Sequence, residues 1–122
     1  MPKLTDPWFE AQFYGRASAG GFTDQGEQIE GSQGLWLWCP CGYGHPRYPL
    51  DGGRPHAIMV PFANPRNAPQ VPPEHGPESR TGGPRPRWTM AGTGLHDLTL
   101  SPSVDVGQPS CWHGFVLNGE VI

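Results

Sequence analysis

Short apolar and alternating stretches mark the regular structure of this chain. Residues 35–39 form a wholly apolar run of strand length. Polar and apolar residues alternate over residues 87–91 and 97–101, which is typical of strands with one buried face. Near the end, Asn118-Gly119 separates two β-forming stretches, a strong hairpin signal. The pattern predicts a mainly β protein, a small antiparallel fold of about five or six strands.

The remaining segments have weaker patterns. Residues 1–34 show no sustained period and are interpreted as an N-terminal extension of a single domain spanning 1–122. Trp8 to Tyr14 is either a short helix capped by Asp6 or, over residues 11–15, a strand. Nine of the 16 prolines lie between residues 55 and 86. Because proline donates no backbone hydrogen bond, residues 61–86 are predicted to form a long Pro-rich loop.

Composition suggests that a large apolar core is not what holds the chain together. Glycine (18) and proline (16) make up more than a quarter of the 122 residues, and only 35% are hydrophobic. A structural zinc site contributes on the order of 10–16 kcal/mol of binding free energy in small peptides, which is comparable to the whole stability of a domain. A bound metal would therefore decide whether such a chain folds.

Three cysteines and one histidine supply a complete set of metal ligands. Cys39, Cys41, Cys111 and His113 are the four sulfur and nitrogen donors that a closed tetrahedral zinc site needs. Within each pair the donors are two residues apart, so they point to the same side of extended chain. Zinc–sulfur bonds of about 2.3 Å hold two sulfurs about 3.8 Å apart, and the glycines and proline around the first pair permit the bend that this requires. We expect one structural zinc ion, bound by two hairpins or turns.

Alternatives remain open at these residues. A disulfide would consume two of the three cysteines, or a cysteine such as Cys111 would simply be a small buried residue. His45 follows Cys41 by four residues and could replace His113 or add a ligand.

The other histidines and the serines are interpreted as ordinary surface residues. His56, His75 and His96 stand beside Pro, Gly or Asp in apparent loops, where a solvated side chain is expected. Ser101 and Ser103 flank Pro102 and are interpreted as turn residues that hydrogen-bond the backbone.

Charge and hydropathy argue against a nucleic-acid partner and against insertion into a membrane. The net charge of −3 argues against nucleic-acid binding, since proteins that bind nucleic acids normally carry a basic face. No apolar run is long enough to cross a bilayer, and the first residues lack the apolar core of a secretion signal. We expect a protein of the reducing cytoplasm, the host cytoplasm if it is phage-encoded, where cysteines bind metal more often than they form disulfides.

The order of motifs resembles a known family. Residues 39–42 read Cys-Pro-Cys-Gly, residues 100–104 read Leu-Ser-Pro-Ser-Val, and residues 111–116 read Cys-Trp-His-Gly-Phe-Val. Over roughly residues 35–122 this is similar to an uncharacterised family of small bacterial and bacteriophage proteins, a domain of unknown function in which these motifs are taken to form a zinc site. Relatives occur in phage genomes and beside bacterial ubiquitin-like conjugation genes. Two departures are the narrow 111–113 spacing, where members often have Cys-x-x-His, and the segment 61–86, which looks like an insertion.

The expected function follows from a closed site with no open position for substrate. We expect a non-enzymatic structural-zinc protein, a phage or prophage accessory or protein-interaction module that binds an unidentified protein partner. Two alternatives stay open. One is a Rieske-like iron–sulfur redox protein, which has two ligand pairs on facing hairpins; the other is a virion structural component in which the Pro-rich loop covers neighbouring subunits.

Overall fold

The structure, a computed structural model, describes residues 2–16, 22–42, 56–72, 86–105 and 112–122. It confirms the mainly β antiparallel fold, with no helix in the described part longer than a single 3-10 turn. The described residues form β1 (Gln12–Arg16), β2 (Phe22–Gly26), β3 (Gly34–Trp38), β4 (Ala57–Pro61), β5 (Thr89–Ala91), β6 (Thr99–Ser101), β7 (Val116–Leu117) and β8 (Glu120–Val121), with two 3-10 turns, η1 (Pro7–Phe9) and η2 (Pro40–Gly42).

The largest sheet has four antiparallel strands in the order β2-β1-β3-β4. The apolar run that predicted β3 buries alternate side chains: Leu35 and Leu37 are fully buried, whereas Trp36 and Trp38 are half-buried. The two tryptophan rings pack edge to face, with centroids 5.1 Å apart. One face of β3 therefore contributes to the core.

The N-terminal segment contains both of the predicted elements, a short helical turn capped by Asp6 and a strand. Asp6 caps η1 by accepting a hydrogen bond from the backbone N–H of Trp8 at 2.9 Å, and the chain then leaves the turn and enters β1. Residues 12–16 and 22–26 are two of the four strands of the main sheet. The segment 1–34 is thus built into the fold.

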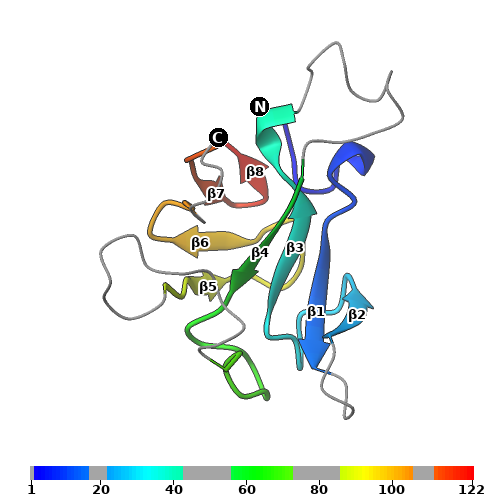
Figure 1. Cartoon of the computed structure of the whole chain (residues 1–122), viewed down its shortest axis with the longest axis vertical. Helices are drawn as coiled ribbons and strands as arrows, with labels where there is room; N and C mark the ends of the chain where they lie inside the picture. Colours follow the sequence, from blue (N-terminus) through cyan, green and yellow to red (C-terminus); the bar gives the residue numbers. More distant parts are fainter. Residues whose placement is uncertain (1, 17–21, 43–55, 73–85, 106–111) are drawn as a thin grey trace.

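Two small ribbons complete the described structure. Strands β5 and β6 pair with each other and run across the direction of β3 and β4 (Figure 1). Strands β7 and β8 form the predicted hairpin, and Asn118 (φ 48°) and Gly119 (φ 80°) have the positive φ angles that a two-residue hairpin turn requires. Isolated bridges join Lys3 to Glu120 and Phe62 to Trp88, so residues earlier in the chain pair with or beside both ribbons.

One apolar cluster lies between these sheets. It contains buried side chains from the main sheet, from both ribbons and from the N-terminal turn: Leu4, Phe9, Phe13, Ile29, Leu35, Leu37, Cys39, Ile58, Val60, Phe62, Trp88, Met90, Leu95, Leu98, Leu100, Val104, Val116 and Val121. The ribbons are too short to be stable as isolated hairpins. Their burial against this cluster is what holds the residues around them in place.

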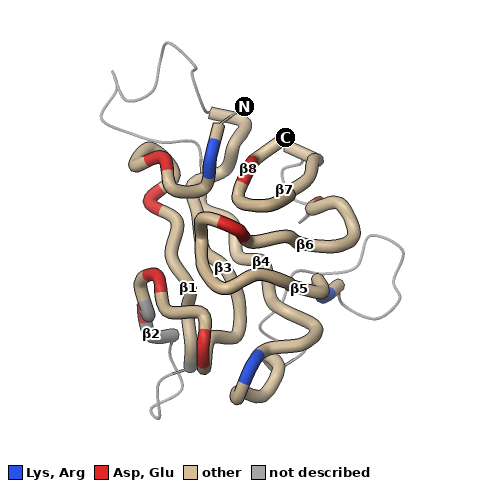
Figure 2. The backbone as a smooth tube through the Cα atoms, turned by 180° about the vertical axis from the view of Figure 1, so that it is seen from behind, with Lys and Arg blue, Asp and Glu red and all other residues tan. Residues whose placement is uncertain are grey.

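Charged residues are sparse on the described backbone. Figure 2 shows its Lys and Arg residues separated from one another, and most of its acidic residues on the side of β1 and β2. Within the described residues, none of the helical segments is long and apolar enough to span a bilayer.

Candidate active site

A pair of backbone hydrogen bonds fixes the polar residues that follow β6 against the residues that precede β7. Val104 N–H donates to Gly114 O at 2.6 Å, and Gly114 N–H donates to Val104 O at 3.1 Å. Side chains alternate between the two faces of paired extended chain. Val104 is buried, so its neighbours Ser103 and Asp105 lie on the other face.

Ser103, His113 and Asp105 form a polar constellation on that outer face. Ser103 Oγ and His113 Nε2 are 2.8 Å apart, within hydrogen-bonding distance. The other ring nitrogen, His113 Nδ1, lies 3.9 Å from Asp105 Oδ2, close enough for an ion pair but long for a hydrogen bond. The His113 side chain is 57% exposed and that of Asp105 21%, so solvent and a substrate can reach the ring.

The geometry has the order of contacts of a Ser-His-Asp triad. In such triads a serine hydroxyl contacts one ring nitrogen of a histidine and a carboxylate faces the other, and the arrangement is recognised by these contacts whatever the fold. Contacts of this kind are often long before substrate binds. The three side chains can therefore act as nucleophile, general base and orienting carboxylate.

The backbone of the serine is held by a buried indole. Trp88 is 2% exposed, and its Nε1–H donates to Ser103 O at 3.0 Å. On the facing strand, a Cβ at Gly114 would clash with the carbonyl oxygen of Ile122 and lie 2.8 Å from Trp112 Nε1. Glycine at this position lets three chain segments approach closely beside His113.

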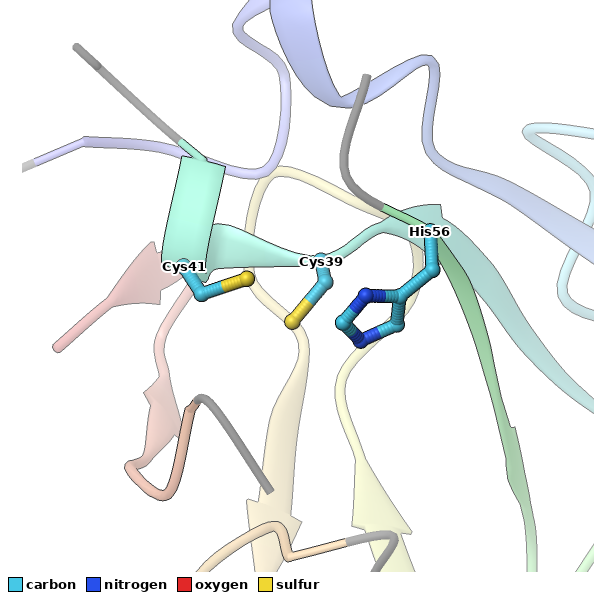
Figure 3. A group of neighbouring side chains, drawn as sticks. All are labelled: Cys39, Cys41 and His56. Carbon is cyan, nitrogen blue, oxygen red and sulfur yellow. The ribbon is translucent and has the colours of Figure 1, made fainter. Parts of the chain in front are cut away.

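A second cluster of chemically active side chains lies at the ends of β3 and β4. The ligand atoms of Cys39, Cys41 and His56 all lie within 4.8 Å of one another, and Figure 3 shows both sulfurs and the imidazole directed toward a common point. Cys39 N–H donates to His56 O at 2.8 Å, which continues the β3–β4 ladder by one residue pair. The strand register therefore places the imidazole beside the first thiol.

The donor set suits a thiophilic metal ion. Two thiolates and an imidazole are ligands that zinc prefers, and the spacing is compatible with sulfurs about 3.8 Å apart on one tetrahedral ion. Burial raises the pKa of the Cys39 thiol, and a backbone hydrogen bond from Cys41 partly opposes this. Cys41 also takes part in a disulfide, so it must be reduced before its sulfur can bind metal as a thiolate.

The structure brings together two of the four predicted ligands and gives His113 a contact that the sequence did not indicate. Cys39 and Cys41 lie together, but the imidazole beside them belongs to His56, which the sequence had assigned to the solvated surface. His113 instead contacts Ser103, a residue interpreted above as a turn residue. Cys111, His45 and His75 lie outside the described residues, so the four-ligand set stays a prediction.

A signal for the triad was present in the sequence. Ser103-Val104-Asp105 alternates polar, apolar and polar residues, and that alternation places Ser103 and Asp105 on one face. What the sequence did not show was that this stretch pairs with the residues around Gly114.

The comparisons with known proteins concern the second half of the chain. Residues 74–122 match the BubE family, described as the serine protease of a bacterial ubiquitination-like system. That span holds Ser103, Asp105 and His113 and leaves out the cluster at Cys39. No curated protein and no solved structure was found to match the chain.

The match supports the bacterial part of the resemblance stated above, whereas the bacteriophage link stays a prediction. It also corrects the expectation of a non-enzymatic protein: the family that residues 74–122 resemble is one of enzymes, named for a catalytic serine. The expectation rested on a closed metal site with no open position for substrate and on the interpretation of Ser103 as a turn residue. Over residues 74–122, the chain is similar to a bacterial serine protease family.

Proposed function

We propose that this chain is a serine hydrolase that cleaves an amide bond in a protein substrate of a bacterial ubiquitination-like system. Ser103 is the nucleophile, His113 the general base and Asp105 the carboxylate that orients the imidazole. The observation that carries the proposal is the 2.8 Å contact between Ser103 Oγ and His113 Nε2, within the segment that matches a serine protease family. The protein partner expected from the sequence would then be the substrate.

The reaction follows from the two ring nitrogens. With its proton on Nδ1, facing the Asp105 carboxylate, the imidazole offers a lone pair at Nε2 to the Ser103 hydroxyl. Ser103 Oγ attacks the scissile carbonyl carbon while Nε2 takes the hydroxyl proton. The same proton passes to the departing amine as the C–N bond breaks, leaving an ester on Ser103. Water, deprotonated by Nε2, then hydrolyses that ester and restores the serine.

The test uses a reagent that needs no knowledge of the substrate. A fluorophosphonate probe should label the purified chain, and the chain should hydrolyse a 4-nitrophenyl ester. Ser103→Ala and His113→Gln should each lower the rate by about a thousandfold or more, since nucleophile and base act as a unit. Ser101→Ala is the matched control, because Ser101 is an exposed serine two residues away. Labelling at Ser101, or equal rates for the wild type and Ser103→Ala, would refute the proposal.

We also propose that Cys39, Cys41 and His56 hold a structural zinc ion when the cysteines are reduced. The support is the convergence of three nitrogen and sulfur donors within 4.8 Å at the junction of β3 and β4, where a metal bond would fix both strand ends. When bound, zinc would supply structural cross-linking. Among the described residues, this group contains three donors and no fourth.

Metal content of the reduced protein tests this second proposal. The wild type should carry about one zinc ion per chain, and His56→Ala should lose most of it, while His113→Ala and His96→Ala should retain it. Zinc lost from His113→Ala and kept by His56→Ala would return the ligand role to His113. A visible absorption band with bound iron would instead favour the iron–sulfur alternative.

A further inference from the structure

Three large apolar side chains are exposed on the described surface, and all three belong to one hairpin. Phe115 is 46% exposed, Leu117 41% and Ile122 43%. Isolated exposed apolar residues are ordinary, but a group of them on one element marks an interaction site. The alternate residues of the same hairpin, Val116 and Val121, are buried. The hairpin therefore has one apolar face in the core and a second apolar face exposed to solvent.

The strand register places this second face next to Ser103. Val104 pairs with Gly114 in an antiparallel bridge, so Phe115 lies opposite Ser103. The Cβ atoms of residues that lie opposite each other in such a pair are about 4.5–5.5 Å apart. Phe115 and Ile122 exchange backbone hydrogen bonds of 3.1 and 2.9 Å, which puts their side chains side by side. Leu117 is two residues beyond Phe115 and shares its face.

The apolar patch and the triad are thus parts of one continuous surface. By register, Asp105 lies opposite His113 at one end of this surface, Ser103 lies opposite Phe115 next to them, and Ile122 and Leu117 lie beyond Phe115. Phe115 is the member of the patch nearest to the nucleophile by register. A side chain of a substrate bound with its carbonyl at Ser103 Oγ would meet these rings and methyl groups within one or two residues of the scissile bond.

We propose that Phe115, Ile122 and Leu117 form the specificity subsite of this hydrolase, which binds a large apolar side chain of an extended peptide next to the bond that is cleaved. The inference rests on the proposed function. Charge favours the same class of ligand: the described residues 99–105 and 112–122 contain no Lys or Arg, and they include the two acidic residues Asp105 and Glu120. The nearest cation by register is Lys3, which lies opposite the carboxylate residue Glu120 in an isolated bridge, and an apolar side chain is desolvated against an apolar surface.

Peptide hydrolysis by the full-length chain tests the subsite. Two fluorogenic peptide series would carry either Leu or Phe, or Ser or Asp, at the positions that flank the scissile bond. The wild type should prefer the apolar series, and Phe115→Ala and Ile122→Ala should each lower kcat/KM for it by about tenfold, with smaller changes for the polar series. Leu117→Ala should have a weaker effect, since Leu117 lies farther from Ser103. Met59→Ala, on β4 in the main sheet, is the control and should change neither series.

Hydrolysis of a 4-nitrophenyl acetate ester separates the two proposals, because the acetyl group of this ester carries no side chain for the subsite to bind. Ser103-dependent ester hydrolysis in Phe115→Ala, with lost preference for apolar peptides, supports the subsite and shows that the variant is folded. Ester hydrolysis that depends on Ser103, combined with peptide selectivity that is the same in wild type and Phe115→Ala, overturns the subsite alone. Absence of Ser103-dependent hydrolysis of any substrate removes the proposed function and the subsite with it. A wild-type dimer that dissociates in Phe115→Ala without a change in selectivity would assign the patch to a second copy of the chain and also overturn the subsite.

Discussion

Asp105 is the member of the triad whose contribution is least fixed by its contacts, with its carboxylate 3.9 Å from His113 Nδ1. Asn at this position keeps the shape but removes the charge that favours the imidazolium formed during attack. We expect Asp105→Asn to lower kcat by about a hundredfold with little change in KM, because the lost interaction strengthens only as positive charge develops on the ring. Steady-state kinetics with a peptide or ester substrate provides the measurement.

Glu120→Gln is the matched control for that substitution, since Glu120 is another partly buried carboxylate of the neighbouring hairpin. It should leave kcat close to the wild-type value. If Asp105→Asn were as active as the wild type, the site would act as a serine–histidine dyad and Asp105 would have no role in orienting the ring.

Gly114 affects both the packing of the backbone and the position of the neighbouring His113. A Cβ there would clash with Ile122 O and approach Trp112 Nε1 at 2.8 Å, so Gly114→Ala must displace the chain next to His113. We expect a loss of about 1–3 kcal/mol in the free energy of unfolding, with a fall in kcat larger than the stability loss explains. Urea denaturation and ester hydrolysis on the same sample measure both. At Gly94 an added Cβ would meet only the exposed His96 ring at 3.2 Å, so Gly94→Ala should be nearly neutral.

Residue identity alone did not show which histidine lies beside Cys39. Cys39 and His56 are neighbours because β3 and β4 pair in one particular register, with Trp38 opposite Ala57, and 16 intervening residues hide that relation in the sequence. Cys111 and His113 are close in sequence, and their proximity suggested a shared ligand role, which stays a prediction because residue 111 lies outside the described residues.

At the scale of elements, the turn between β5 and β6 depends on one carboxylate. Asp97 Oδ1 accepts hydrogen bonds from the N–H groups of Thr93 and Gly94 at 2.8 and 2.9 Å, and Asp97 Oδ2 accepts one from Thr93 Oγ1 at 2.9 Å. The backbone hydrogen bond from Thr93 is the largest of the effects that hold the pKa of Asp97 below its ordinary value, and nearby His96 adds a smaller one. The turn is therefore organised around the ionised form.

The sign of the pH dependence follows from that direction. A carboxyl with a lowered folded-state pKa contributes stability above its unfolded pKa of about 3.9, and the contribution disappears as the pH falls through the lower folded value. We expect Asp97→Asn to lower the urea midpoint at pH 6. As the pH is lowered from 5 through the folded-state pKa of Asp97, the variant should lose less stability than the wild type. Wild-type and variant curves that run parallel over this range would show that Asp97 contributes nothing through its ionisation.

Elements with a clear period were predictable, and elements without one were not. The alternation at residues 87–91 and 97–101 and the Asn118-Gly119 turn predicted β5, β6 and the final hairpin because side-chain period and turn chemistry are local properties. Strand β2 was missed, since residues 22–26 are mostly polar or glycine, and the strand is held by pairing along β1. Pairing of this kind depends on residues distant in sequence.

At the scale of the whole molecule, the segment that resembles the protease family is not a self-contained unit. Leu4 N–H donates to Gly119 O and Val121 N–H to Pro2 O, both at 2.8 Å, so the first residues pair with the last hairpin through an isolated bridge at Lys3. Trp88, whose indole holds Ser103, exchanges backbone hydrogen bonds with Pro61 and Ala63 at 3.0 and 2.7 Å. Ten of the eighteen core residues that the structure describes precede residue 74.

These contacts predict the behaviour of the isolated segment 74–122. Without the main sheet its two short ribbons lose most of the apolar surface that covers them, and two-stranded ribbons are marginal in water. We expect the fragment to show no cooperative thermal transition and no fluorophosphonate labelling, whereas the full chain shows both. Adding a separately produced fragment 1–73 should restore part of the labelling if the two pieces reassemble. A fragment 74–122 that unfolds cooperatively and labels at Ser103 would mean that the Ser103–His113 site needs neither the hydrogen bonds of Trp88 to residues 61–63 nor the pairing of residues 2–4 with the last hairpin.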